Sequence, residues 1–518
     1  MKSLALPLLV VPVFFITACG SSESDSRDPD DPRLDASAET SQTEDTGVEA
    51  ETGQPDAGPE TGEEAATEAS TDASEDAANG LLACGTQPSL PACPTTTPPP
   101  TQNAAIEEFV TDNAVALRCN EPSGKEGWDF QSLLDASAES NLIMTGEVHG
   151  SDQIGPMSAA LFKTLARAGR IDVVAIEMPM EWSDDADEWV VSGTGFFGET
   201  IVPMMPPAMM WRALPTAAKE LHGEGITIPV VGVDFPYDQT KINQRIEAIA
   251  TSLDPTVAEA LLEGLPPPVD YQGLVDQGYV DAAEAYHQHV VGNKAEFCSA
   301  LDDRTCSRLE TYAWALYVGG FTHLPGFFGA YTPALMQWFE DREQLIFMNY
   351  QHIFADGTER VYAHMGTNHA GKGDDVVAQW LHEQFEPTTG KLFTLTYGMG
   401  PDSVITYRGE LEDLDPKPTQ MSNALSGAPS DVYFLSSVLP GGDCVGNPFK
   451  NMTIPNSGWG STLKYGTTYD GIVFYRQLSP EGNGAFRSRG LDPRWERVQR
   501  WQKMKSMEAR WARDRKRS

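Results

Sequence analysis

The chain has 518 residues, enough for several domains, and its 75 acidic against 36 basic side chains give a formal charge of -39. Such an acidic protein is a poor partner for nucleic acid, because the phosphate backbone binds basic surfaces. Beyond the N-terminus, no segment of the sequence is apolar over enough residues to predict a membrane span.

The N-terminus has the pattern of an export signal. An apolar run from Leu4 to Ile16 is too short to span a bilayer, and small residues lead from it to Cys19. The pattern resembles a bacterial lipoprotein signal, in which Cys19 is lipidated and becomes the mature N-terminus. The alternative is an ordinary signal with a coincidental cysteine. Gly20 rather than aspartate follows Cys19, so residues 1–19 predict a lipid-anchored protein of the cell envelope, sorted to the outer membrane.

An acidic segment follows the signal. Residues 20–80 contain 19 Asp or Glu against two Arg, with small and polar residues between them. Such a sequence cannot bury enough apolar surface to offset the entropy lost on ordering. With the Pro/Thr-rich stretch up to residue 101, we expect residues 20–101 to form a disordered linker between the lipid and a folded domain over residues 102–480.

The cysteine count predicts disulfides. If Cys19 carries lipid, six cysteines remain, and an even number in an exported protein favours pairing. Fifteen pairings are possible. Short loops favour two local pairs and leave a third, which gives Cys84 with Cys93, Cys298 with Cys306, and Cys119 with Cys444.

Within residues 102–480, apolar runs alternate with stretches of helical spacing. This alternation predicts an α/β fold with a mostly parallel central sheet flanked by helices, and a helical insertion after the third strand. The expected strands are residues 142–145, 171–177, 228–234, 360–364, 391–397, 403–408, 432–435 and 471–475. The expected helices are residues 104–117, 130–138, 157–168, 182–191, 212–222, 241–317 with a break near 264–270, 332–354 and 374–385.

The C-terminal tail, residues 481–518, is basic in an otherwise acidic chain. From residue 486 onward it holds twelve basic and four acidic side chains, and large apolar residues recur near helical spacing, namely Trp495, Val498, Trp501, Met504 and Trp511. This pattern predicts a basic amphipathic helix. Such a helix either docks on the acidic domain of its own chain or lies on anionic lipid.

Acids and histidines stand at or just beyond the ends of the first four expected strands. Parallel strands point their carboxyl ends toward one edge of the sheet, where ligands bind in open α/β folds. We therefore expect one shared polar site at this edge. Its candidate residues are Glu147, His149, Glu177, Asp234, His364 and His369.

Four short motifs carry a family resemblance. In order, they are Gly146-Glu-Val-His-Gly150, Val174-Ala-Ile-Glu-Met-Pro179, Val231-Gly-Val-Asp-Phe-Pro236 and Val361-Tyr-Ala-His-Met-Gly-Thr-Asn-His369. They resemble the erythromycin esterase-like family and the related haem-uptake ChaN-like and Tiki/TraB proteins, over roughly residues 104–480. The pair Asp341-Arg342 and the strand after Tyr469 fit the same plan.

The resemblance implies a hydrolase that cleaves an ester or a related bond in a small molecule and requires no cofactor. His149 would be the base that activates water, and Glu147 and Glu177 would orient the base or the water. Arg342, with His364 or His369, would stabilise the developing oxyanion. Asp234 would contact the substrate. The chain departs from the esterase pattern at Gln153 and Ser158, where a glutamate and an arginine are usual, and its last two histidines are more widely spaced.

Other chemistries remain open. No Gly-x-Ser-x-Gly or His-Glu-x-x-His motif occurs, which disfavours a serine hydrolase and the commonest zinc protease. A divalent metal could be held by Glu147, His149, Glu177 and His369, as in a Tiki-like metallopeptidase. A surface protein that binds metal or haem without turnover is the third reading. A buried Arg342 beside the histidines would repel a cation and favour metal-free hydrolysis.

Overall fold

A computed structural model describes the chain between residues 103 and 478. The signal with Cys19, the acidic linker and the basic tail lie outside the described residues. Within the described part, no helix combines the length and the apolar character needed to cross a membrane. Residues not described within this span are 118–127, 129, 206–207, 271–272, 326, 328–331, 374–375, 401–402, 408–409, 414–419, 429–431, 437, 440–441, 444–452, 456–461 and 465–467.

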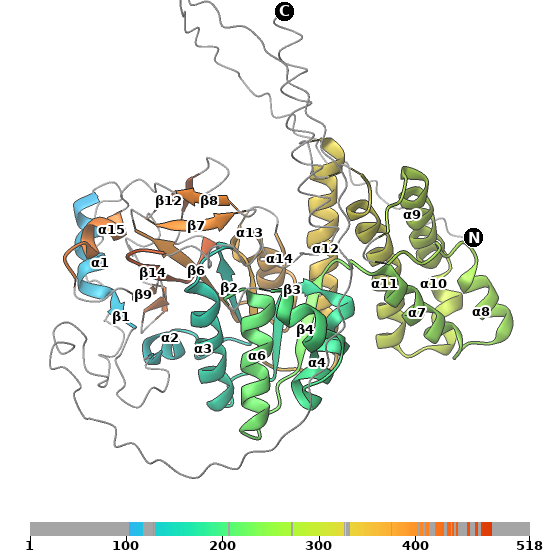
Figure 1. Cartoon of the computed structure of the whole chain (residues 1–518), viewed down its shortest axis with the longest axis horizontal. Coiled ribbons are helices and arrows are strands. Elements are labelled where there is room, and N and C mark those ends of the chain that lie inside the picture. Colours follow the sequence, from blue (N-terminus) through green and yellow to red (C-terminus); the bar gives the residue numbers. More distant parts are fainter. Residues whose placement is uncertain are drawn as a thin grey trace, which may run out of the picture. The chain divides into compact units, whose positions relative to one another are not determined.

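An eight-stranded sheet forms the centre of the described part, which confirms the α/β fold (Figure 1). Its order is β1-β9-β14-β6-β2-β5-β3-β4. The six strands from β14 to β4 run parallel, and β9 is antiparallel to both of its neighbours. The strands are β1 (Val115–Ala116), β2 (Leu142–Glu147), β3 (Val173–Pro179), β4 (Val230–Asp234), β5 (Val361–Gly366), β6 (Leu392–Met399), β9 (Val432–Ser436) and β14 (Gly471–Tyr475).

Helices cover both faces of the sheet, because side chains along each strand alternate between two cores. Ile143 packs into the first core, whereas Leu142 and Met144 pack into the second. The helices of the first core are α2 (Gln131–Ala136), α3 (Ile154–Arg167), α4 (Ser183–Ser192) and α6 (Met210–Gly223). Those of the second are α1 (Asn103–Asn113), the C-terminal half of α12 (Pro333–Ala355), α14 (Val377–Glu383) and α15 (Gln420–Leu425).

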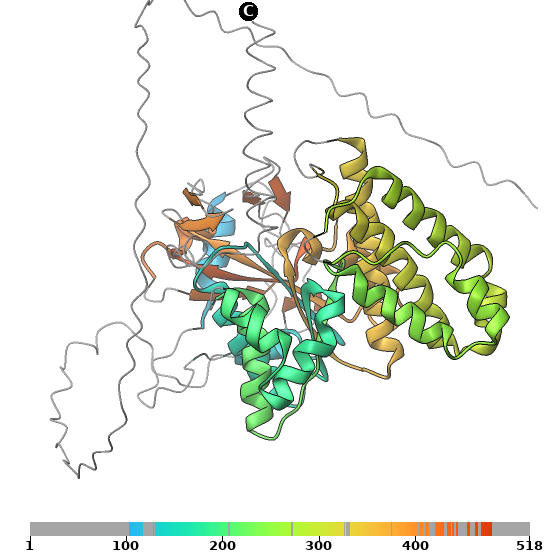
Figure 2. The same cartoon turned by 45° about the vertical axis from the view of Figure 1, so that its right-hand side comes forward.

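The helical insertion follows β4 and has a third core of its own. Figures 1 and 2 show its helices together beside the β4 end of the sheet. Aspartates at N-cap positions start four of them, since each carboxylate accepts a backbone N–H of the first turn. The helices are α7 (Gln239–Ala250), α8 (Pro255–Leu262), α9 (Gln277–Gly292), α10 (Lys294–Phe297) and α11 (Asp303–Thr322).

A disulfide joins Cys298 to Cys306 within this insertion, with Cα atoms 5.2 Å apart, as the short loop between them predicts. The other two expected pairs involve Cys84, Cys93, Cys119 and Cys444, which lie outside the described residues.

The structure corrects several expected elements. The first helix ends at Asn113 rather than residue 117, because Val115 and Ala116 form β1 and pair with β9. The expected helix over 241–317 divides into five. The strand expected at 403–408, now β7 (Val404–Tyr407), pairs with β8 (Glu410–Asp413) outside the main sheet. Two unexpected hairpins are β10 (Val438–Leu439) with β11 (Gly442–Asp443) and β12 (Thr453–Pro455) with β13 (Thr462–Lys464).

Candidate active site

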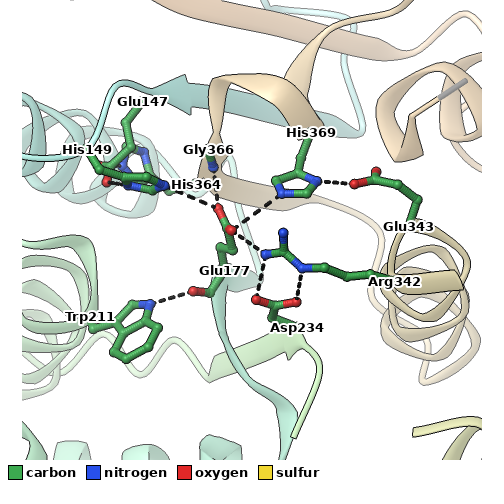
Figure 3. Close-up of polar contacts among 10 residues, drawn as sticks. All are labelled: Glu147, His149, Glu177, Trp211, Asp234, Arg342, Glu343, His364, Gly366 and His369. Carbon is green, nitrogen blue, oxygen red and sulfur yellow. Dashed lines mark hydrogen bonds and ion pairs between the residues drawn. The ribbon is translucent and has the colours of Figure 1, made fainter. Parts of the chain in front are cut away.

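The carboxyl ends of β2, β3, β4 and β5 meet at one edge of the sheet and carry a polar cluster (Figure 3). The short helix α13 (Thr367–Ala370) and the middle of α12 complete it. The structure therefore brings together all seven residues that the sequence singled out for one site. They are Glu147, His149, Glu177, Asp234, Arg342, His364 and His369.

Four residues from β2, β5 and the turn after β2 form the Glu147 cluster: Thr145, Glu147, His149 and His364. Glu147 lies between two imidazoles, with Oε1 against Nδ1 of His149 and Oε2 at 2.5 Å from Nε2 of His364. On the far side of His364, Nδ1 lies 2.6 Å from the hydroxyl of Thr145. Because the carboxylate holds Nδ1 of His149, the nitrogen of His149 that remains for chemistry is Nε2.

The charges in the Glu147 cluster support this arrangement. Burial opposes ionisation of Glu147, but the two imidazoles outweigh it and lower its pKa to about 2. An ionised Glu147 accepts hydrogen bonds from both rings. Partial burial also opposes the charged form of His149, yet the carboxylate of Glu147 raises the pKa of His149 to about 9. His149 is therefore a stronger base than an ordinary histidine.

Two glycines determine the backbone path at the end of β2 and in the turn after His149. A side chain at Gly146 would place Cβ 2.9 Å from Cβ of Ala370 and 3.0 Å from Cα of Thr367, so only glycine lets α13 approach β2. Gly150 has a φ of 97°, a left-handed conformation that favours glycine in the turn after His149. The Gly-Glu-Val-His-Gly motif thus sets the position of the histidine through its two ends.

Five residues from β3, β4, α12 and α13 form the Arg342 cluster: Glu177, Asp234, Arg342, Glu343 and His369. Arg342 donates from Nε and Nη2 to the two oxygens of Asp234, at 2.8 and 2.7 Å, and from Nη2 to Oε1 of Glu177 at 2.5 Å. His369 lies between two carboxylates, with Nε2 at 3.4 Å from Oε1 of Glu177 and Nδ1 in an ion pair with Glu343. Every charge in this cluster has an opposite charge beside it.

Burial makes these ion pairs strong. All five residues are buried, with 9% or less of their surface exposed. Burial opposes ionisation of Glu177, but His369 and Arg342 hold its pKa well below the usual range. Burial likewise disfavours the charged form of His369, yet Glu343 and Glu177 raise its pKa to about 10 against the opposing effect of Arg342. Glu177 is therefore a weak base that is suited to orienting a partner.

A distortion of β3 directs Glu177 into the site. The β3–β4 register shifts between Ile176 and Pro179, where β3 contains one more residue than β4. Two further contacts fix the residue: Trp211 donates its indole N–H to the carbonyl of Glu177, and the amide of Gly366 donates to Oε2 at 2.5 Å. Glu177 is thus held at its backbone and at both carboxylate oxygens.

The two clusters meet where Nε2 of His149 faces Oε2 of Glu177 at 3.9 Å. The side chain of His149 is 48% exposed, whereas those of Glu147 and Glu177 are 6% and 11% exposed. Nearby, no described residue accepts a hydrogen bond from Nη1 of Arg342, which Figure 3 shows pointing toward His369. Glu177 therefore lies between a half-exposed imidazole at Oε2 and the guanidinium of Arg342 at Oε1.

The two later histidines have different places in this arrangement. His364 is fully buried behind Glu147, and both of its ring nitrogens face partners inside the cluster. His369 faces Glu177 and Glu343 with its two nitrogens. Both histidines therefore face carboxylates, whereas Nη1 of Arg342 is a donor for which no described residue is an acceptor.

The donor set does not fit a divalent cation. The carboxylate oxygens of Glu147 and Glu177 already face imidazole, guanidinium or amide groups, and the cation of Arg342 adjoins Glu177. Over the residues that the structure describes, no group of three or more His, Cys, Asp or Glu side chains is arranged to hold a metal ion.

Four residues of the site were not singled out from the sequence: Thr145, Trp211, Glu343 and Gly366. Glu343 directly follows Arg342 on α12, and this adjacency was a signal available in the sequence. Gly366 lies inside a motif that was quoted for its histidines, and Thr145 ends the expected strand 142–145 just before the first motif. Trp211 donates to a backbone carbonyl across 34 residues, a contact without a local sequence signal.

Comparisons with known proteins bear on the fold. No family model and no curated protein matches the chain. A solved structure of a Bacillus cereus protein matches with a TM-score of 0.56 and 13% identity, over 73% of this chain and 98% of the other. A succinoglycan biosynthesis protein matches with a TM-score of 0.54 and 16% identity, over 73% and 98%. A mutant erythromycin esterase, EreC in its open conformation, matches with a TM-score of 0.52 and 10% identity, over 68% and 96%.

The chain has the fold of an erythromycin esterase. This likeness confirms the fold that the four short motifs implied, and it covers nearly the whole of each solved structure. At these identities it shows the fold alone, so the chemistry of the site rests on the geometry of its own residues.

Proposed function

We propose that the protein is a metal-free hydrolase that cleaves an ester or a related bond with His149 as general base. The observation that carries this proposal is the position of His149. Glu147 holds its Nδ1, while its half-exposed Nε2 faces Oε2 of Glu177 at 3.9 Å. A histidine held by a carboxylate at one nitrogen, with the other open to a reacting group, is the arrangement of general-base catalysis.

The proposed reaction starts with a water molecule between His149 and Glu177. Neutral His149 takes a proton from this water at Nε2 while the water oxygen attacks the acyl carbon. The carbonyl oxygen becomes an oxyanion, which Arg342 stabilises from Nη1. The bond to the leaving oxygen then breaks, and that oxygen takes the proton back from Nε2. One ester and one water give one acid and one alcohol.

The raised pKa of His149 predicts how the activity depends on pH. His149 must be neutral to accept a proton, and its pKa is about 9. Below this value kcat/KM should rise about tenfold for each pH unit, and it should level off above it. A profile that levels off near neutral pH would contradict the raised pKa of His149.

A screen of chromogenic acyl esters and lactones with the purified protein tests the proposal. His149→Ala should lower turnover of any substrate found by about 10²–10⁴-fold, the usual contribution of a general base. Its unfolding midpoint should stay near that of the wild type, because the side chain is half exposed. Full activity of His149→Ala would refute the assignment. Tight binding of haem or a metal through these histidines, without hydrolysis of any ester, would favour the binding-protein alternative.

We also propose that this hydrolase works at the cell envelope, anchored by lipid on Cys19 and assisted by the basic tail on anionic lipid. The support is the sequence of the signal, the acidic linker and the tail. Cys19→Ala should move the protein from the membrane pellet to the soluble fraction or leave an unprocessed precursor. Unchanged labelling by a fatty-acid analogue in Cys19→Ala would contradict the anchor.

A further inference from the structure

Gly366 stands at the end of β5, under the two residues that face each other across the site. Its φ of -60° and ψ of 148° are angles that any residue adopts, so the backbone does not require glycine here. A Cβ at this position would lie 3.0 Å from Oε2 of Glu177 and 3.2 Å from Nε2 of His149. The missing side chain therefore keeps open the space that these two atoms share.

This situation differs from that of Gly146. At Gly146 a Cβ would meet Ala370 and the backbone of Thr367, which is a packing constraint between β2 and α13. At Gly366 the nearest atoms are the two polar atoms of the proposed reaction, followed by Cδ2 of His369 at 3.6 Å. Packing explains the first glycine, whereas the second needs an explanation in terms of what binds between the polar atoms.

The distances across this space suit one water molecule. Nε2 of His149 and Oε2 of Glu177 are 3.9 Å apart, so a water beside the line between them can lie about 2.8 Å from each. Such a water would donate one hydrogen to the carboxylate and the other to neutral His149. Its remaining lone pairs would then point away from both residues, toward a substrate.

We propose that Gly366 is a positioning residue that forms the floor of the attacking-water site. Its amide fixes Oε2 of Glu177 at 2.5 Å, and its bare Cα leaves room for the water between Glu177 and His149. This inference rests on the proposed hydrolase function and names the place where its nucleophile binds. The water oxygen forms the new bond to the acyl carbon, and its proton goes to Nε2 of His149.

The substitution Gly366→Ala tests this proposal in the full chain, with Gly373→Ala as its matched control. Gly373 lies seven residues later, and a Cβ there would come no nearer than 4.0 Å to Oγ1 of Thr468. Gly366→Ala should lower kcat by about 10²-fold with KM little changed, since water activation rather than substrate binding is lost. Gly373→Ala should leave both parameters unchanged.

A second measurement needs no substrate. Diethyl pyrocarbonate acylates neutral imidazole nitrogen, and peptide mass spectrometry gives the rate at each histidine. The methyl group of Gly366→Ala would cover Nε2 of His149, so labelling of His149 at a fixed pH should slow several-fold. Labelling of His222, a half-buried histidine outside the site with its Nδ1 at 2.9 Å from Oγ1 of Thr227, should be the same in all variants and serves as the internal reference.

The outcomes separate the two proposals. Slower labelling with a fall in kcat supports the water site, whereas unchanged kcat or unchanged labelling of His149 overturns it. If the wild type hydrolyses no ester and His149 still labels more slowly in Gly366→Ala, the hydrolase proposal fails, but the position of Gly366 beneath His149 is supported.

If Gly366→Ala unfolds, Glu177→Asp replaces it as the test variant. Withdrawing the carboxylate should lower kcat without slowing the labelling of His149, and an unchanged kcat would overturn the water site.

Discussion

The Glu147 cluster and the Arg342 cluster use the same residue types in opposite ways. In the Glu147 cluster, one carboxylate contacts two imidazoles. Nε2 of the half-exposed His149 has no hydrogen-bond partner among the described residues and faces Glu177 at 3.9 Å. In the Arg342 cluster, the carboxylates, the guanidinium and His369 are buried and paired with one another.

The two clusters therefore have different roles in the site. A histidine with one open nitrogen and a raised pKa can take a proton from a substrate group. A buried network in which every charge is paired resists proton transfer, and it holds Glu177 and Arg342 where the chemistry needs them. We therefore propose that the Glu147 cluster supplies the base, whereas the Arg342 cluster orients the water through Glu177 and stabilises the oxyanion through Arg342.

The largest effect on stability should come from Arg342→Met. This change leaves Asp234 and Glu177 buried without their cation, and breaking a buried pair costs about 3–5 kcal/mol of the free energy of unfolding. Urea unfolding measures this loss.

Arg167→Met is the matched control. Arg167 and Glu224 form an ion pair in which each side chain is 43% exposed, and such pairs contribute about 0–1 kcal/mol. Equal losses in the two variants would contradict the difference in burial.

A smaller effect, on activity, should come from Glu177→Gln. The amide keeps the shape of the side chain but cannot accept from Arg342, Gly366 and a water at the same time. We expect kcat to fall by about 10²-fold, within the range for a residue that orients a base or its water. Glu343→Gln, on the other side of His369, should cost less than about tenfold, because Glu343 contacts neither His149 nor the water site. A larger loss in Glu343→Gln would place the base in the Arg342 cluster.

The smallest effect should come from Thr145→Val. Its hydroxyl lies 2.6 Å from Nδ1 of His364, and removing it leaves a buried ring nitrogen without a partner. An unmade buried hydrogen bond costs about 1–3 kcal/mol, so kcat should fall by about tenfold and the pH profile should shift. Thr145→Ser should restore both. Tyr362→Phe, which removes a weaker contact of 3.3 Å with the same hydroxyl, should have little effect. A normal pH profile in Thr145→Val would limit Thr145 to packing.

Much of the fold could be predicted from the sequence, because hydrophobic periodicity determines the elements that carry the core. The runs that became β2, β3, β4 and β5 are continuous and bounded by turn residues, so their type and order were clear. Val115 and Ala116 were assigned to a helix because two residues carry no period. Their pairing with β9, more than 300 residues later in the chain, is a tertiary contact that local sequence does not encode.

The site could be predicted as a group of residues but not as an arrangement. Parallel strands determine where their carboxyl ends lie, so the acids and histidines after them could be placed at one edge. Which carboxylate meets which imidazole depends on the bulge at Glu177 and on where α12 crosses the sheet. His364 or His369 was therefore expected beside Arg342 near the oxyanion, whereas His364 lies behind Glu147 and His369 lies between Glu177 and Glu343. Gly366 was missed because its contribution is a backbone amide and a missing side chain.

The most direct test of the account is the titration of His149 in the wild type and in Glu147→Gln. The labelling of His149 by diethyl pyrocarbonate, measured at each pH, monitors this titration. The carboxylate of Glu147 favours the charged imidazole, so labelling of the wild type should rise with pH through a midpoint of about 9. Removing that charge should move the midpoint down toward the ordinary value for histidine, near 6.5. A wild-type midpoint already near the ordinary value, or one that Glu147→Gln does not move, would contradict the claim that Glu147 makes His149 the base of this site.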